Sequence, residues 1–117
     1  MHAIASSASD TSDEIKASCV VVFTFTGNTA IEVASFRPKR PILALCINVD
    51  VARQLMVYWN IKTVTVPECK SMKRMLSLAD KKVLESNCGK SGDSYVLIAG
   101  TPGQSGKTDF LHVRKLK

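Results

Sequence analysis

The sequence predicts an α/β domain: a three-layer sandwich whose mostly parallel five-stranded sheet has helices on both faces and an antiparallel last strand. Short apolar runs alternate with segments of helical periodicity, and this alternation is typical of parallel sheets. The runs "CVVVF" and "PILALCI" are apolar throughout, as in strands covered on both faces. The final segment, "DFLHVRKL", follows another strand through a loop without a helix, so we expect antiparallel pairing there. All 117 residues are expected to form this single domain.

The first half of the chain contributes two helices and two strands to this expectation. The first helix has Ile4, Ala8 and Ile15 on one side, although its Ser and Thr residues lower the helix propensity. The second helix is short and ends before Pro38, because proline cannot continue a helix. Over the whole chain, the expected helices are 3–15, 29–36, 49–59 and 69–86, and the expected strands are 18–25, 41–47, 61–66, 94–100 and 109–116.

The second half contributes two helices with clear apolar stripes. Asn48 is a suitable N-cap for a helix that continues through Trp59. The stripe expected on that helix is Val49, Ala52, Leu55, Met56 and Trp59. The stripe expected on the longest helix is Met72, Met75, Leu76, Ala79 and Val83. Between them "IKTVTV" alternates apolar and polar residues, so this strand is expected to be more exposed than the others.

Composition argues against several classes of protein. The chain is 45% hydrophobic, as in a folded domain, but no apolar run approaches the roughly 20 residues that span a bilayer. Its N-terminal segment has neither the basic region nor the apolar core of a secretory signal. We therefore expect a cytoplasmic protein without a membrane partner.

Cysteines and charges point to no metal and no nucleic acid. The four cysteines include no CxxC pair, and neither histidine is near a cysteine. We therefore expect reduced, structural thiols and no zinc site. The net charge of +6 is spread over separate basic clusters that are not interleaved with aromatic residues. Such clusters offer no stacking platform for bases, so solvated faces and a few cations near an anion site are favoured.

One glycine-rich loop, "GTPGQSGKT" at residues 100–108, is similar to a nucleotide-binding P-loop but differs in spacing and context. Five residues separate Gly100 from Gly106, whereas a P-loop has four at that place. The segment that follows alternates like a strand, so no helix N-terminus faces the loop. This loop is therefore not expected to bind ATP in the manner of a P-loop.

A second loop, "TFTGNT" at residues 24–29, has the composition of a phosphate site. Hydroxyl groups at Thr24, Thr26 and Thr29 surround a glycine turn that leads into a helix. Backbone N–H groups at a helix N-terminus together with hydroxyls bind phosphate well. Taken alone, a Thr–Gly turn before a helix is more often a plain cap, and a Gly-rich loop is more often a plain hairpin turn. In open α/β sheets, however, both would lie at the carboxyl ends of strands, where ligands gather.

With their flanks, the two loops resemble the C-terminal domain of pyruvate kinase over essentially the whole chain. The segments that carry the resemblance are "VVVFTFTGNTAIEVASFRPKRPILAL", "ARQLMVYWNI" and "GDSYVLIAGTPGQSGKTDFLHV", in this order and spacing. The resemblance implies a regulatory domain that packs beside a catalytic (β/α)₈ barrel, helps to form a homo-tetramer and in many members binds a sugar bisphosphate. Fructose 1,6-bisphosphate, fructose 2,6-bisphosphate or another phosphorylated anion is thus the expected ligand.

The resemblance also assigns the expected effector-binding residues. They are Thr24, Phe25, Thr26, Gly27, Asn28 and Thr29 in the first loop, Thr101, Gly103, Ser105, Gly106 and Lys107 in the second, and Lys73 and Arg74 near the start of the long helix. The chain departs from the family at Asn28, where many members have a long residue such as arginine, and at Thr101-Pro102, where animal-type activated enzymes have Trp-Arg. These departures leave open which effector binds, or whether one binds at all.

No catalysis is expected from this chain alone. The Lys, Arg and carboxylate residues that pyruvate kinase chemistry uses, and its Mg²⁺ and K⁺ ions, belong by resemblance to the barrel, for which the chain has no room. The sequence leaves open a structural module of the same fold with a degenerate effector site. It also leaves open a small free-standing enzyme acting on phosphate esters, which would show turnover, and a nucleic-acid binder, which would show steep salt dependence.

Overall fold

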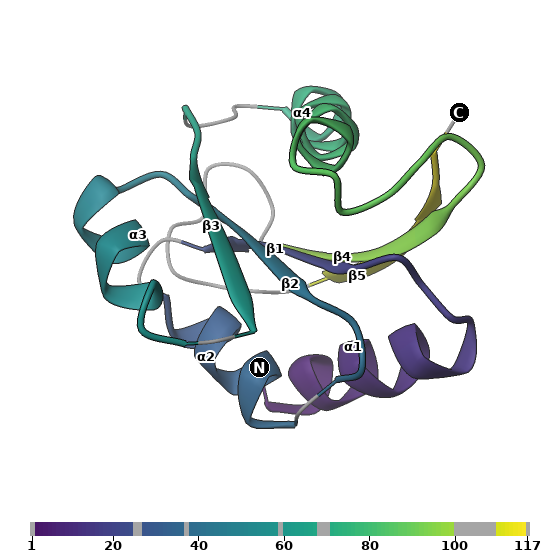
Figure 1. Cartoon of the computed structure of the whole chain (residues 1–117), viewed down its shortest axis with the longest axis horizontal. Coiled ribbons are helices and arrows are strands. Elements are labelled where there is room, and N and C mark those ends of the chain that lie inside the picture. Colours follow the sequence, from purple (N-terminus) through teal and green to yellow (C-terminus); the bar gives the residue numbers. More distant parts are fainter. Residues whose placement is uncertain are drawn as a thin grey trace.

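The computed structural model describes residues 2–24, 27–36, 38–58, 60–67, 71–99 and 110–116 (Figure 1). In chain order its elements are α1 (His2–Glu14), β1 (Val20–Thr24), α2 (Asn28–Ser35), β2 (Ile42–Cys46), α3 (Val49–Leu55), β3 (Ile61–Thr65), α4 (Met72–Glu85), β4 (Ser94–Ala99) and β5 (Phe110–Lys115). This is the order of helices and strands that the sequence predicts, with bounds that differ by a few residues.

The strands form one sheet in the order β3-β2-β1-β4-β5. β1 pairs in parallel with β2 and β4, β2 pairs in parallel with β3, and β5 runs antiparallel to β4. A helix connects each pair of parallel strands that follow one another in the chain, because the chain must return to the same edge of the sheet before it starts again. The predicted fold class is confirmed.

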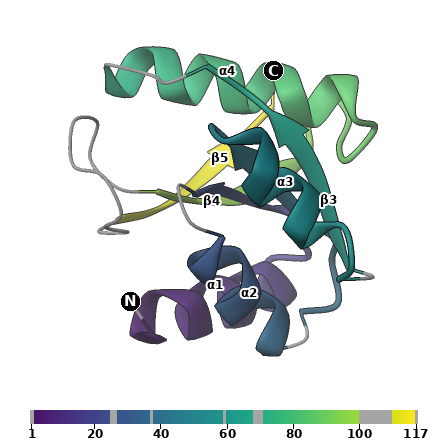
Figure 2. The same cartoon turned by 90° about the vertical axis from the view of Figure 1, so that its left-hand side faces the viewer.

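Strand side chains alternate between two apolar cores, one on each face of the sheet. Val20 and Val22 of β1 belong to the core formed with α1, α2 and α3, whereas Val21 and Phe23 belong to the core formed with α4. Figure 2 shows α4 on one side of the sheet and α1 and α2 on the other. Both faces of β1, β2 and β4 are therefore covered, which explains why these segments are apolar throughout.

α3 starts where the sequence predicts but ends earlier. The Oδ1 atom of Asn48 accepts a hydrogen bond from the backbone N of Asp50 at 2.7 Å, which confirms the predicted cap. The helix ends at Leu55, so its predicted continuation towards Trp59, a residue outside the described ones, is wrong for residues 56–58. These residues form a turn instead, and Tyr58 accepts a backbone hydrogen bond from Ile61 at the start of β3.

The apolar stripe predicted on α3 is only partly buried. Ala52 and Leu55 pack into the core, but Val49 and Met56 are 50% and 70% exposed. A helix of seven residues has fewer than two full turns to present to the sheet, so its terminal positions extend beyond the contact. The predicted core role of Val49 and Met56 is therefore wrong.

The stripe predicted on α4 is correct apart from its first residue. Met75, Ala79 and Val83 are buried and Leu76 packs against the same core, whereas Met72 is 36% exposed in the first turn. The helix begins at Met72 and is capped by Ser71, whose hydroxyl accepts a hydrogen bond from the backbone N of Arg74 at 3.3 Å.

An ion pair joins α4 to the edge strand β5. Arg114 donates two hydrogen bonds to Asp80, from Nε to Oδ1 at 3.0 Å and from Nη2 to Oδ2 at 2.7 Å. The hydroxyl of Tyr95 also donates to Oδ1 of Asp80. Burial, and then the neighbouring carboxylate, raise the pKa of the Tyr95 hydroxyl, so it stays a donor. The bidentate contact between Arg114 and Asp80 fixes β5 against α4.

Candidate functional site

Three helices begin at the carboxyl edge of the sheet, where the sequence predicts an anion site. β1, β2 and β3 are parallel, so the helices that follow them, α2, α3 and α4, all begin at this edge. Figure 2 shows this edge on its left-hand side. Of the first predicted loop, Thr24, Gly27, Asn28 and Thr29 are described, while Phe25 and Thr26 lie outside the described residues.

The start of α2 is built around the hydroxyl group of Thr24. Its Oγ1 atom accepts a hydrogen bond from the backbone N of Gly27 at 2.8 Å, and the residue is only 5% exposed. Gly27 adopts a left-handed conformation with φ of 89°, which glycine accepts without steric cost. Because the carbonyl of Gly27 then accepts the first helical hydrogen bond, from Ile31 at 3.1 Å, the turn leads directly into α2.

Gly27 is also held by α3 beneath it. A Cβ atom at this position would lie 3.2 Å from Cγ1 of Val51 and 3.4 Å from Cδ2 of Leu55. The backbone of the loop therefore contacts the neighbouring helix closely, and its position is fixed by packing as well as by the Thr24 hydrogen bond. A loop held in this way presents its N–H groups in a constant geometry.

At this turn, the part that an anionic ligand would contact is the N-terminus of α2. Asn28 is exposed, whereas the Thr29 side chain is 6% exposed and packs inward. The first amides of a helix have no partner within the helix and carry the positive end of its dipole. Backbone groups at the start of α2 are thus better placed to meet an anion than the described threonine hydroxyls.

Lys73 and Arg74 lie in the first turn of α4, both exposed. α4 starts at the same edge of the sheet as α2, but the two helices cover opposite faces (Figure 2). The structure therefore places these two cations and the start of α2 on either side of the carboxyl edge. A ligand that contacts both would have to extend across the ends of the strands.

The second predicted loop connects β4 and β5 as a hairpin. Ala99 and Phe110 are paired in antiparallel register at its two ends. Thr101, Gly103, Ser105, Gly106 and Lys107 lie between them, outside the described residues. Because a strand and not a helix follows the loop, the P-loop interpretation is excluded, as the sequence predicts.

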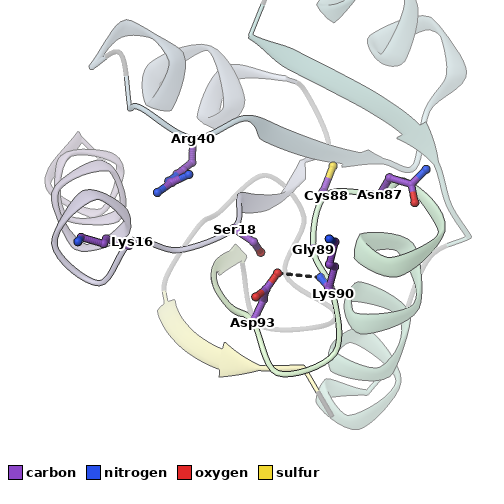
Figure 3. Close-up of a pocket in the computed structure, with 8 residues that line it drawn as sticks. All are labelled: Lys16, Ser18, Arg40, Asn87, Cys88, Gly89, Lys90 and Asp93. Carbon is purple, nitrogen blue, oxygen red and sulfur yellow. Dashed lines mark hydrogen bonds between the residues drawn. The ribbon is translucent and has the colours of Figure 1, made fainter.

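A second group of polar residues, which the sequence analysis did not single out, lines a cavity of about 330 Å³ at the opposite, amino edge of the sheet (Figure 3). Its lining residues are Lys16, Ser18, Arg40, Asn87, Cys88, Gly89, Lys90 and Asp93. They come from the connections before β1, β2 and β4. No single sequence motif marks such a set, because it combines the turn of residues 87–93 with two distant segments, at residues 16–18 and at Arg40, which come together only after the sheet forms.

The described part of the chain contains neither a candidate metal cluster nor a candidate membrane-spanning helix. Within those residues, no three His, Cys, Asp or Glu side chains gather closely enough to hold a metal ion. None of the described helices is long and apolar enough to cross a membrane.

Comparison with known proteins gives a consistent result along the chain. Residues 2–114 match the family model described as "Pyruvate kinase, alpha/beta domain". The chain is 37% identical over 117 residues to pyruvate kinase 2 of Synechocystis sp.. This match covers 99% of the chain and 20% of that protein. It is 30% identical over 114 residues to the Lactococcus lactis pyruvate kinase and 34% identical over 112 residues to the Geobacillus stearothermophilus one. These matches cover 97% and 95% of the chain but 23% and 19% of the two proteins, so the chain spans about a fifth of its relatives.

Proposed function

The chain belongs to the pyruvate kinase family, as its alpha/beta domain, and from this premise we propose that it regulates a pyruvate kinase and contributes to contacts between subunits. The arrangement at the carboxyl edge carries the proposal. The starts of α2 and α4 and the end of β4 all lie at this edge, where ligands bind in open α/β sheets.

The ligand in this proposal is a phosphorylated anion, and a sugar bisphosphate such as fructose 1,6- or 2,6-bisphosphate is its most specific form. One phosphate would bind the amides at the start of α2, next to Thr26 and Asn28. The second would meet a cation, from Lys73 or Arg74 on α4 or from Lys107 in the hairpin. Support comes from the fixed geometry of the Gly27 turn and from the exposure of both cations on α4.

Catalysis is assigned to the rest of the subunit. Transfer of a phosphoryl group from phosphoenolpyruvate to ADP, with its Mg²⁺ and K⁺, would occur in a barrel of which this chain has none of the strands. The domain would act by coupling. An effector that contacts residues 100–109 at a subunit interface favours the conformation of the enzyme that has those contacts, and so changes activity at a distance.

A titration followed by backbone amide NMR tests the site directly. With fructose 1,6-bisphosphate or fructose 2,6-bisphosphate, we expect saturable shifts confined to residues 24–29, 73–74 and 101–107. Thr26→Glu should abolish them, because a carboxylate would then occupy the phosphate position and repel the ligand. Thr26→Ser should retain them, and Ser91→Glu, an identical charge change in an exposed turn at the opposite edge, should also retain them. Retained affinity in Thr26→Glu would disprove the site.

A second candidate, a subunit-contact module with a degenerate effector site, is favoured by one observation. The described threonine side chains of the first loop, Thr24 and Thr29, are at least nine-tenths buried and hold the turn and the helix. This candidate predicts self-association in sedimentation velocity that bisphosphate leaves unchanged. A dimer or tetramer without NMR shifts at millimolar ligand would favour it over effector binding.

A further inference from the structure

The cavity at the amino edge is positively charged. Lys16 and Arg40 reach it from two separate connections, and Lys90 comes from the turn before β4 (Figure 3). The carboxylate of Asp93 lies on the same wall, where its Oδ2 atom accepts a hydrogen bond from the backbone N of Lys90 at 2.9 Å. Three cations and one carboxylate that already holds the turn leave an excess of positive charge, which favours an anionic ligand.

A thiol, Cys88, is part of the wall of this cavity. It follows the end of α4, where its backbone N donates to the carbonyl of Val83 at 3.0 Å. The next residue, Gly89, allows the turn to lie against β1 and the C-terminal segment: a Cβ atom there would be 2.7 Å from Oγ of Ser18 and 3.0 Å from Cδ1 of Leu116. This close approach brings Cys88 against Cys19 of the core, a thiol with no exposed surface.

The two thiols differ in what their surroundings favour. The Cys88 thiol donates a hydrogen bond to the carbonyl of Ser86 at 3.7 Å. The neighbouring Cys19 thiol and then the positive charge of Lys62 lower the pKa of Cys88 to about 7 despite partial burial. Lys62 is held nearby by its hydrogen bond to the carbonyl of Ser86 at 2.7 Å. The neighbouring Cys88 thiol and burial raise the pKa of Cys19, so Cys19 keeps its proton. Asp93 acts on Cys19 in the same direction.

Cys88 therefore combines what a reactive thiol requires. It lines an open cavity, it has the Cys19 thiol behind it, and the lining of the same cavity includes cations from three connections. Cys46, by contrast, is fully buried in β2, and burial raises its pKa to about 11. Reactivity of cysteines follows thiolate character and access, so the structure separates Cys88 from Cys46 on both counts.

We propose that Cys88 is a site of reversible thiol–disulfide exchange with a small disulfide that carries carboxylates, which binds in the basic cavity. The Cys88 thiolate attacks one sulfur of the bound disulfide, a new S–S bond forms and the original S–S bond breaks. The leaving sulfur departs as a thiolate with the electron pair and takes a proton from solvent. The incoming disulfide is the oxidant, so Cys88 is oxidised and the released thiol is the reduced product. Excess free thiol reverses the step.

The volume and the charge of the cavity define this ligand class. About 330 Å³ lies at the lower end of the roughly 300–1,000 Å³ range of small-molecule sites, so a tripeptide-sized half of the disulfide is favoured over a protein segment. Carboxylates on that half would meet Lys16, Arg40 and Lys90. This inference is independent of effector binding, because the two sites lie at opposite edges of the sheet.

The test uses oxidised glutathione as the anionic probe, with cystamine as a cationic and bis(2-hydroxyethyl) disulfide as a neutral one. Rates are measured by intact-mass spectrometry on the whole chain and divided by the rates for the urea-unfolded chain, which correct for intrinsic reactivity. Among the cysteines that the structure describes, we expect an adduct at Cys88 and none at Cys19 or Cys46. After correction, oxidised glutathione should react about tenfold faster than the neutral disulfide at low salt, and this preference should fall as salt is added.

Two variants separate the contributions. Lys16→Gln with Arg40→Gln should remove the preference for oxidised glutathione and leave the neutral probe unchanged. Cys19→Ala removes the neighbouring thiol, so the pH midpoint of exchange should rise from about 7 towards the ordinary cysteine pKa of 9.0. The rate at pH 7 should then fall about sixfold, since the loss of thiolate exceeds the gain in nucleophilicity. Cys19→Ser keeps a donor and should restore the wild-type profile.

Three results would overturn the proposal. The first is an adduct on Cys19 or Cys46 of the native chain, or the lack of one on Cys88. The second is a wild-type pH midpoint near 9.0. The third is a product that has lost two hydrogen atoms and gained no adduct, which would assign Cys19 and Cys88 to an internal disulfide.

Discussion

At the carboxyl edge of the sheet the described threonine side chains face inward, whereas at the amino edge charged side chains face a cavity. Thr24 is 5% exposed and its hydroxyl holds the Gly27 amide, so its polarity serves the backbone. Lys16, Arg40 and Cys88 line a space of about 330 Å³ and leave their functional groups available to a ligand. The difference shows that polar residues close together in sequence can serve a local turn, while a cavity can form from residues without any motif.

Among the substitutions that test this comparison, Gly89→Ala at the amino edge should cause the largest loss of stability. The new Cβ atom would lie 2.7 Å from Oγ of Ser18 and 3.0 Å from Cγ1 of Val83, so the turn must move away from β1. Forced packing of this kind costs about 2–3 kcal/mol in the free energy of unfolding, measured by urea denaturation. The displacement should also slow exchange at Cys88.

Gly92→Ala is the matched control in the same turn. Gly92 has a φ of +94°, but a Cβ atom there would meet nothing within 4 Å. Its cost should therefore be backbone strain alone, about 1 kcal/mol, without an effect on Cys88. Equal losses in the two variants would mean that close packing at Gly89 does not hold the amino edge together.

The next effect, at the carboxyl edge, is expected from Thr24→Val. Valine has nearly the same shape but offers no acceptor to the Gly27 amide, which lies 2.8 Å from the hydroxyl in a buried position. An unsatisfied buried N–H costs about 2 kcal/mol. Thr24→Ser keeps the acceptor and should cost less, and hydrogen exchange at Gly27 should be faster only in the valine variant. If both variants unfold alike, the hydroxyl does not hold the turn.

The smallest effect is a dependence of stability on pH that arises at the amino edge. The pKa of Cys88 is about 7 in the folded chain, whereas an ordinary cysteine has a pKa of 9.0. Between these values the unfolded state binds more protons, so stability rises with pH. The rise should be about 1 kcal/mol, less than the full shift would give because the thiol is partly exposed to solvent. It should be absent in Cys88→Ser. A wild-type curve parallel to that of Cys88→Ser between pH 7 and pH 9 would contradict the lowered pKa.

The fold could be predicted from the sequence, and so could the position of the first loop, residues 24–29, at the carboxyl edge. Ligand binding by that loop stays a prediction. Buried parallel strands must be apolar on both faces, so "CVVVF" and "PILALCI" identified β1 and β2, and Asn48 identified the cap of α3. The end of α3 could not be predicted from the sequence, because Val49 and Met56 fit a helical stripe whether or not another element packs against them. Propensity and periodicity describe a segment alone, and burial depends on what packs against it.

By itself the sequence determined the order of helices and strands, the antiparallel last strand and the family to which the chain belongs. Local patterns suffice for these because periodicity, capping and turn residues act over a few neighbouring positions. Only the tertiary structure decided the strand order β3-β2-β1-β4-β5, the ion pair of Asp80 with Arg114, and the meeting of Lys16, Arg40 and Cys88 at one edge. Each joins residues distant in the chain, and their interactions exist only once the sheet has assembled and excluded water between them.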